Sequence, residues 1–289
     1  MLAITLVSPD PAALAEAAAA VRAALAISSE TVLGEGALDL LADGPPVEAH
    51  QAVKAAVGER PVDFAVQAVE NRRKRLLIAD MDSTIINVEC LDELADFAGV
   101  KDKVSEITER AMRGELAFEG ALRERVGMLK GLSVDALQNC YDDRVKLNPG
   151  ARTLVRTMAE YGARCALVSG GFTFFTSRVA QVAGFHLNRA NTLIEADGKL
   201  TGTVGDPILG KEAKLAALRE ETAALGLTPA DALAVGDGAN DLAMIEVAGL
   251  GVAYRAKPIV AAQAHAKVDH ADLTALLYFQ GYTQAEFVA

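Results

Sequence analysis

The chain has 289 residues, 51% of them hydrophobic and 23% charged, so it can bury a sizeable core and is not a disordered tail. Its net charge of −11 argues against a broad surface for nucleic acid or an anionic membrane. No apolar run approaches the ~18 residues that a membrane span needs, and no basic segment of a secretory signal begins the chain. Three scattered cysteines without a CxxC pair fit a reducing compartment. We therefore expect a cytoplasmic protein of two domains, with neither nucleic acid nor a membrane as partner.

The first 70 residues predict a small α+β domain of βαβαβ type, because short apolar runs alternate with helical patterns. This stretch contains no obvious catalytic cluster. The expected elements are a strand at 3–7, a helix at 11–25, one or two strands within 31–41, a helix at 47–57 and a strand at 62–66.

The basic run Arg72-Arg73-Lys74-Arg75 separates this domain from the rest of the chain. A run of this kind is either a linker or a patch for nucleic acid. Since the whole chain is acidic and an apolar strand follows, we interpret it as a solvated linker. The predicted second domain then covers residues 71–289.

Residues 71–289 predict an α/β fold with a parallel sheet, because short apolar runs alternate with helical stretches. Three of the predicted strands end directly before a polar residue. In open parallel sheets the ligands bind outside the carboxyl ends of the strands, so these polar residues should converge. The strands with the residues that follow them are 76–79 with Asp80, 165–168 with Ser169, and 232–235 with Asp237.

A long helical insertion, residues 87–147, follows the first of these strands and is placed to cover its carboxyl end. We therefore expect a cap on a core formed by residues 71–86 and 148–289. Farther along, residues 191–204 alternate around Asp197-Gly198, which predicts a hairpin.

Two acidic motifs follow buried strands: Asp80-Met81-Asp82, and Gly236 to Asp241 with aspartates at both Asp237 and Asp241. Each aspartate alone is more simply read as a helix cap or turn residue. Together they would share one crevice, where two carboxylates ~5 Å apart repel by roughly 3 kcal/mol at an effective dielectric constant of 20. A divalent cation would relieve this repulsion, and an oxygen-only site favours Mg²⁺.

The chemistry of these residues suggests phosphoryl transfer. An ionised carboxylate needs no base to attack phosphorus, so Asp80 is the candidate nucleophile, and Asp82 is placed to exchange a proton with the leaving group. Ser169-Gly170-Gly171 would let a hydroxyl and backbone N–H groups approach a phosphate, although a plain turn would look the same. No GxSxG, GxxxxGK[ST] or dinucleotide motif is present.

These motifs, with a lysine among residues 211–214, occur in the order typical of the haloacid dehalogenase (HAD) superfamily of phosphatases, which residues 74–280 resemble. Within it, the stretches 88–93 and 118–126 are similar to the cap of the phosphoserine phosphatase family. The resemblance implies a Rossmann-like core with a helical cap. The first 70 residues weakly resemble ACT-like regulatory domains, for which amino-acid binding, homodimer formation and structural support all remain open.

The resemblance also assigns roles. It makes Asp80 the nucleophile and Asp82 the general acid and base, and it gives the recognition of the serine ammonium and carboxylate to Glu89 and Arg125. The implied Mg²⁺ ligands are Asp80, the backbone carbonyl of Asp82, and Asp237, with Asp241 behind them. The implied phosphate contacts are Ser169, Gly170, Lys214 and Asn240, with Lys211 as the less favoured lysine.

The expected function is therefore Mg²⁺-dependent hydrolysis of O-phospho-L-serine to serine and phosphate, through an aspartyl-phosphate, as the last step of serine biosynthesis. Two alternatives stay open. One is a phosphatase or phosphotransferase of the same superfamily that acts on another small phosphomonoester. The other is a non-catalytic amino-acid sensor with this fold, against which the intact acidic motifs argue.

Overall fold

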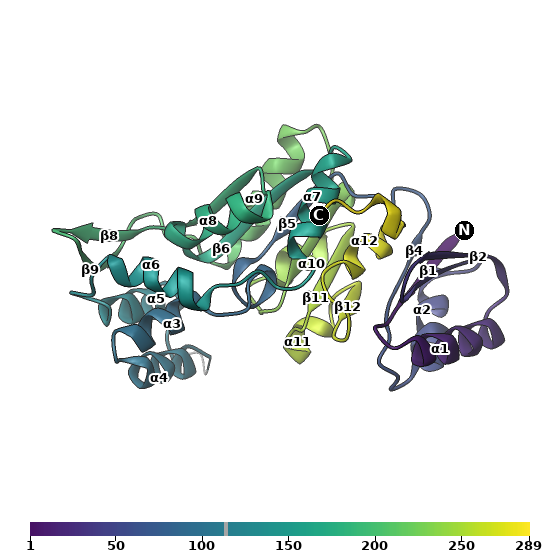
Figure 1. Cartoon of the computed structure of the whole chain (residues 1–289), viewed down its shortest axis with the longest axis horizontal. Coiled ribbons are helices and arrows are strands. Elements are labelled where there is room, and N and C mark those ends of the chain that lie inside the picture. The colour runs from purple at the N-terminus through teal and green to yellow at the C-terminus, as the bar shows by residue number, and fades with distance from the viewer. Residues whose placement is uncertain (113–114) are drawn as a thin grey trace.

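A computed structural model describes residues 1–112 and 115–289. Ten strands form one sheet in the order β2-β3-β1-β4-β12-β11-β10-β5-β6-β7, and β8 and β9 form a separate pair (Figure 1). The strands are β1 (Leu2–Val7), β2 (Ile27–Gly34), β3 (Ala37–Ala42), β4 (Asp63–Ala68), β5 (Leu76–Ala79), β6 (Arg164–Phe172), β7 (Leu187–Asn191), β8 (Leu193–Ala196), β9 (Lys199–Val204), β10 (Ala232–Gly236), β11 (Leu250–Tyr254) and β12 (Ala266–Val268).

Helices lie on both faces of the core strands, beside the N-terminal strands, and in the insertion that follows β5. They are α1 (Pro11–Ala24), α2 (Pro46–Val57), α3 (Cys90–Phe97), α4 (Lys101–Met112), α5 (Phe118–Gly127), α6 (Asp135–Arg144), α7 (Ala151–Glu160), α8 (Thr173–Ala183), α9 (Lys211–Ala224), α10 (Leu242–Val247), α11 (Pro258–Ala261) and α12 (Ala275–Phe279). A π-helical turn, Met81–Ile85, follows β5, and short 3₁₀ turns lie at Pro229–Asp231 and Gln284–Glu286.

The core sheet is parallel from β12 through β11, β10, β5 and β6 to β7, which confirms the predicted α/β class. The strand β5 is buried on both faces, because successive side chains point to opposite sides of a strand. Leu77 packs with α7, α8 and α12 on one side, whereas Ile78 packs with α9, α10 and α11 on the other. This double cover fixes β5 in the middle of the molecule and directs its carboxyl end at the site described below.

The first 70 residues fold as βαββαβ. The sequence predicted one or two strands within residues 31–41, and the structure has two there, β2 and β3. The N-terminus of α1 is capped by Asp10, whose carboxylate accepts the N–H groups of Ala12 and Ala13, and Pro11 occupies the first helical position. The strand β4 pairs with β12 through Lys267 and Phe64, so this four-stranded sheet continues the core sheet.

The interpretation of the run 72–75 as a solvated linker is wrong for two of its side chains. The Arg72 side chain is 11% exposed and binds Asp39 through both carboxylate oxygens, at 2.6 and 2.7 Å. Lys74 is buried and donates to the carbonyl groups of Asn71 and Ala230. Carboxylate and carbonyl oxygens of the protein take the place of water around these two cations. A run of charges in the sequence does not reveal such partners.

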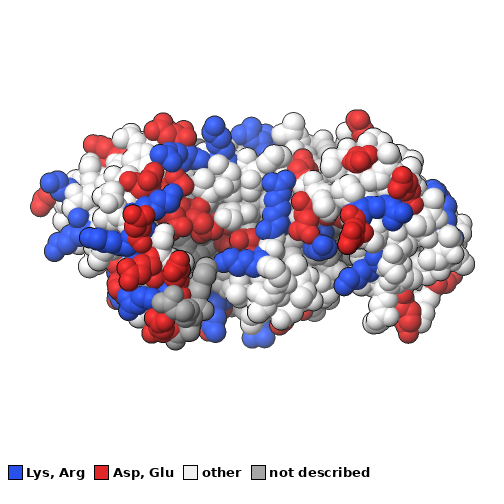
Figure 2. All heavy atoms as spheres, turned by 90° about the horizontal axis from the view of Figure 1, so that it is seen from below, with Lys and Arg blue, Asp and Glu red and all other residues white. Residues whose placement is uncertain are grey.

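Helices α3 to α6 form the predicted helical insertion, and with the hairpin β8–β9 they lie at the end of the molecule opposite the N-terminal strands (Figure 1). The hairpin turns at Asp197-Gly198, where both residues have positive φ, as a two-residue hairpin turn requires. On the face drawn in Figure 2, acidic and basic side chains are interspersed, and many acidic ones lie at the left end with the cap helices. Among the described residues, no helix is both long and apolar enough to cross a membrane.

Candidate active site

The carboxyl ends of β5, β10 and β6 bring the predicted motifs together. The strand β5 pairs with β10 through Ala79 and Val235, and with β6 through Ala79 and Leu167. The backbone N–H of Asp80 continues the ladder by donating to Val235 at 3.0 Å. Because Leu167 and Val235 are both aligned with Ala79, Asp80, Asp237 and Ser169 lie at the same edge of the core, although β6 continues past Ser169 to Phe172.

Three carboxylates, those of Asp80, Asp237 and Asp241, offer oxygen atoms that all lie within 4.8 Å of one another. The ammonium of Lys214 lies 2.8 Å from the Asp80 carboxylate and 2.5 Å from that of Asp241. Lys211, by contrast, is exposed and lies 3.8 Å from its neighbour Glu212, so the structure brings only Lys214 of the two lysines into the cluster.

The charges of this cluster do not balance. With all groups ionised, three carboxylates and one ammonium leave a net charge of −2 around buried oxygen atoms. Burial raises the pKa of Asp80 well above its usual range, and the Asp241 carboxylate raises it further, although Lys214 opposes both. Burial, Asp241 and Glu89 together raise the pKa of Asp237 to about 6. Oxygen ligands with surplus negative charge fit a hard divalent cation.

Asp82 lies in the π-helical turn after β5, and its carboxylate is outside this group of three. Its Oδ1 accepts the backbone N–H of Cys90, the first residue of α3, at 3.2 Å. Burial and the nearby Glu89 carboxylate raise the pKa of Asp82 to about 7. A carboxyl group with this pKa gains and loses a proton readily near neutral pH, as a general acid and base must.

The segment Ser169-Gly170-Gly171 was predicted to follow the strand 165–168, but it lies inside β6, at an irregular part of the strand between Val168 and Phe172. Close contacts shape this segment. The Ser169 hydroxyl is buried and accepts the N–H of Gly171 at 2.8 Å. A Cβ on Gly171 would lie 2.8 Å from the Asp82 carboxylate, so only glycine fits there. A Cβ on Gly170 would lie 3.4 Å from the ring of Phe118, which shows that the cap lies close to this segment of β6. Asn240 is partly buried beside Gly238, in the turn that carries Asp237.

The cap contributes Glu89, directly before α3, and Arg125 on α5. The Glu89 carboxylate accepts a hydrogen bond of 2.6 Å from the Ser83 hydroxyl. Burial lowers the pKa of Arg125, while the acidic Asp92 and Glu89 oppose this, so a cation and a carboxylate of the cap lie within electrostatic reach of each other. The structure thus places all ten predicted site residues at the strand ends, on the adjoining helix α9, or on the cap that covers them.

Comparisons with known proteins agree with this geometry. Residues 77–246 match the model of the haloacid dehalogenase-like hydrolase family. This chain belongs to that family. It is 48% identical over 208 residues to a phosphoserine phosphatase of Polaromonas sp. strain JS666, an alignment that covers 70% of this chain and 88% of the relative. The predicted family is therefore confirmed.

Two solved structures resemble this HAD hydrolase. A probable phosphoserine phosphatase from Vibrio cholerae, in unliganded form, superposes with a TM-score of 0.79 at 32% identity and covers 99% of this chain and 88% of its own. A phospho-aspartyl intermediate analogue of phosphoserine phosphatase gives a TM-score of 0.66 at 38% identity and covers 72% of this chain and 99% of its own. The N-terminal strands thus have a counterpart in the first of these neighbours.

Sequence reasoning missed two groups in the site of this HAD hydrolase. Asn191, at the carboxyl end of β7, donates to the carbonyl groups of Gly170 and Leu209 and accepts the N–H of Leu209, so it links the carboxyl-terminal part of β6 to the segment before α9. The Thr84 hydroxyl lies 3.3 Å from the Asp237 carboxylate. Asn191 carried a usable signal, because it too ends a parallel strand, whereas nothing in the sequence marked Thr84.

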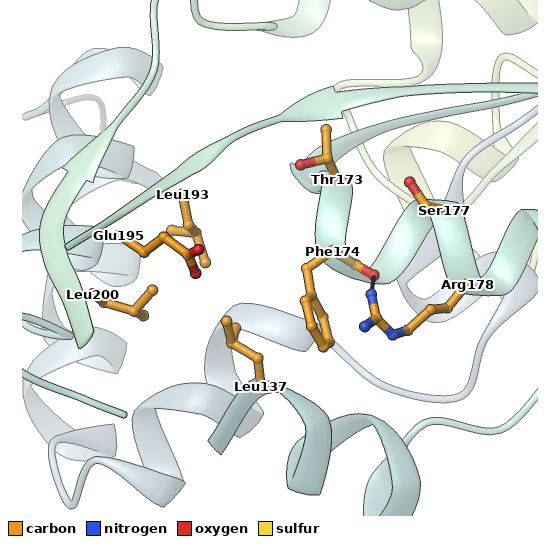
Figure 3. Close-up of a pocket in the computed structure, with 8 residues that line it drawn as sticks. All are labelled: Leu137, Thr173, Phe174, Ser177, Arg178, Leu193, Glu195 and Leu200. Atoms are coloured by element: carbon orange, nitrogen blue, oxygen red, sulfur yellow. Dashed lines mark hydrogen bonds between the residues drawn. The ribbon is translucent and has the colours of Figure 1, made fainter. Parts of the chain in front are cut away.

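A separate hollow of about 270 Å³ lies between α6, α8 and the hairpin β8–β9 (Figure 3). Leu137 and Leu200 give it an apolar wall, and Arg178 stacks on the ring of Phe174 and donates to its carbonyl at 2.8 Å. No predicted site residue lines this hollow.

Proposed function

We propose that this HAD hydrolase cleaves O-phospho-L-serine to L-serine and phosphate, with Mg²⁺ as cofactor and an aspartyl-phosphate on Asp80 as intermediate. The observation that carries the proposal is the buried surplus of carboxylates around Lys214 at the ends of β5 and β10. The Polaromonas relative, a phosphoserine phosphatase, and the probable phosphoserine phosphatase of Vibrio cholerae support the choice of substrate. The reaction would complete serine biosynthesis.

In the proposed reaction the Asp80 carboxylate attacks phosphorus, and the bond between phosphorus and the serine oxygen breaks. Asp82 gives its proton to that oxygen as it leaves. A water molecule then attacks the aspartyl-phosphate while Asp82 takes a proton from it, so phosphate is released and both aspartates return to their starting states. The pKa of Asp82, raised to about 7, supports this double role.

The remaining residues of the core would bind the metal ion and the phosphoryl group and neutralise the negative charge of that group. Asp80, Asp237 and the backbone carbonyl of Asp82 would hold Mg²⁺, which when bound supplies positive charge against the transferring phosphoryl group. Asp241 forms an ion pair with Lys214 and would help to position the metal ligands without binding the ion itself. The proposed phosphate contacts are Ser169, Gly170, Lys214 and Asn240.

The cap would recognise the amino-acid part of the substrate. Glu89 would accept the ammonium group, and Arg125 would bind the carboxylate with its planar guanidinium. Both belong to the cap, whose Phe118 ring would lie 3.4 Å from a Cβ on Gly170 in β6.

The test is phosphate release from a panel of phosphomonoesters, with Mg²⁺ and after chelation. Phosphoserine should give the highest kcat/KM, and chelation should abolish the activity. Preference for another phosphomonoester would replace the substrate assignment, and no release from any compound would favour an amino-acid sensor instead.

A matched pair of variants tests the carboxylate clamp. Arg125→Ala should reduce kcat/KM for phosphoserine far more than for phosphoethanolamine, which lacks the carboxylate. Arg123→Ala removes a neighbouring exposed arginine that pairs with Asp206, and should change neither value. Equal losses on both substrates in Arg125→Ala would contradict the clamp.

We also propose the division of the chain into an ACT-like domain at 1–70 and a phosphatase domain at 71–289, with the cap at 87–147. The βαββαβ order of the first unit supports the first boundary. We further propose a cytoplasmic location, which the three buried free cysteines support because thiols stay reduced there. A homodimer is a further proposal, which sedimentation of the full chain would test.

A further inference from the structure

Ser83 has an unusual backbone for its residue type. It lies in the π-helical turn after Asp82 with φ of 54° and ψ of 0°, a left-handed region that glycine and asparagine occupy more readily than serine. A residue held in such a conformation is often retained for what its side chain or backbone does there. The contacts of Ser83 indicate what that is.

Ser83 joins the catalytic turn to the beginning of α3. Its backbone N–H donates to the carbonyl of Val88 at 3.2 Å, and its hydroxyl donates to Oε1 of Glu89 at 2.6 Å. The neighbouring Asp82 accepts the N–H of Cys90. Three consecutive cap residues are therefore bound to two consecutive residues of the turn.

The hydroxyl of Ser83 makes the one hydrogen bond that the Glu89 carboxylate forms within the described part of the chain. A glutamate side chain has several rotatable bonds, and holding one oxygen in place removes most of this freedom before a ligand arrives. The second oxygen keeps its lone pairs for another donor.

We propose that Ser83 is a positioning residue for substrate specificity, which orients the Glu89 carboxylate toward the ammonium group of the substrate. The inference rests on the proposed function and deepens it, since it assigns the selection of an amine to a pair of residues. The positive φ at Ser83 directs the side chain to the cap while the preceding Asp82 faces Gly171.

The experiment compares two substrates that differ only in the amine: O-phospho-L-serine and 3-phosphooxypropanoate. Ser83→Gly removes the hydroxyl and tolerates the positive φ. It should lower kcat/KM for phosphoserine about tenfold or more, chiefly through KM, because a hydrogen bond to a charged group is lost. The loss on 3-phosphooxypropanoate should be several times smaller.

Two further variants separate the hydroxyl from the backbone. Ser83→Ala loses the same hydroxyl but keeps the strained φ, so it should match Ser83→Gly in substrate preference while melting at a lower temperature. Ser28→Ala, in the N-terminal strand β2, removes an exposed hydroxyl that binds the carbonyl of Leu41 and should alter neither substrate.

Combination with Glu89→Ala, which leaves no acceptor for the Ser83 hydroxyl, completes the test. If Ser83 acts through Glu89, Ser83→Gly should cost little further phosphoserine activity once Glu89 is replaced. Equal losses on both substrates, or additive losses in the double variant, would overturn the inference while leaving the proposed function intact. Wild-type enzyme that does not hydrolyse phosphoserine would overturn both.

Discussion

Two regions of this hydrolase bury ion pairs, and they differ in how the charges balance. At the junction of the N-terminal sheet with the core, Arg72 binds Asp39 through both oxygens, and its Nε donates to the carbonyl of Phe279. In the active site, Lys214 faces the surplus of carboxylates around Asp80. A balanced buried pair is complete by itself, whereas an unbalanced one requires a proton or a cation. The imbalance therefore separates a functional site from a structural contact.

Loss of the nucleophile gives the largest expected difference between the two regions. Asp80→Asn should reduce phosphate release by ~10³-fold or more, because no other group can form the covalent intermediate. It should not lower the melting temperature, since it removes one of the repelling carboxylates. Activity measured beside thermal melts checks both parts, and retained turnover would remove Asp80 from the nucleophilic role.

The opposite pattern is expected at the junction. Arg72→Ala leaves Asp39 buried without its cation and should cost about 3 to 5 kcal/mol of stability, while the folded enzyme keeps its kcat/KM. Arg22→Ala is the control, because its pair with Glu30 is exposed and should contribute little to stability. Urea unfolding gives the free energies. A lower kcat/KM of the folded Arg72→Ala variant would show that the junction also affects catalysis, and would contradict its purely structural role.

A bound cation should stabilise only the unbalanced region. Mg²⁺ at ~100 times its dissociation constant should add about 2.7 kcal/mol to the free energy of unfolding. The same addition to Asp237→Asn should have a much smaller effect, since one proposed ligand is lost. Thermal melts against Mg²⁺ concentration measure this difference, and an equal response of both proteins would place the cation elsewhere.

The pH dependence of the metal-free protein gives a further test that only the unbalanced region should pass. The folded-state pKa values of Asp82 and Asp237, about 7 and about 6, lie above the ordinary value of 3.8. The folded protein therefore holds protons that the unfolded chain has lost, and the associated stability disappears as pH rises through 6 and 7. Each unit of pKa difference corresponds to about 1.4 kcal/mol at most. Melting temperatures from about pH 5 to 8 should fall, and less steeply in Asp82→Asn.

Local patterns were sufficient for most of the elements. The strand 76–79 and the hairpin at Asp197-Gly198 were predicted at their observed positions, because buried runs and turn residues are signals of the chain itself. The second strand within 31–41 stayed undecided, because glycines interrupt its pattern and only pairing with β1 and β2 completes β3.

Sequence by itself determined the fold class, the family and the acidic motifs, since these follow from the order of residue types along the chain. Only the tertiary structure decided which charges meet. It buried Arg72 against Asp39, brought Lys214, which the sequence already favoured over Lys211, to Asp80 and Asp241, and brought Ser83 to Glu89. The physical reason is that burial and ion pairing depend on distances between segments far apart in the chain, which no local pattern records.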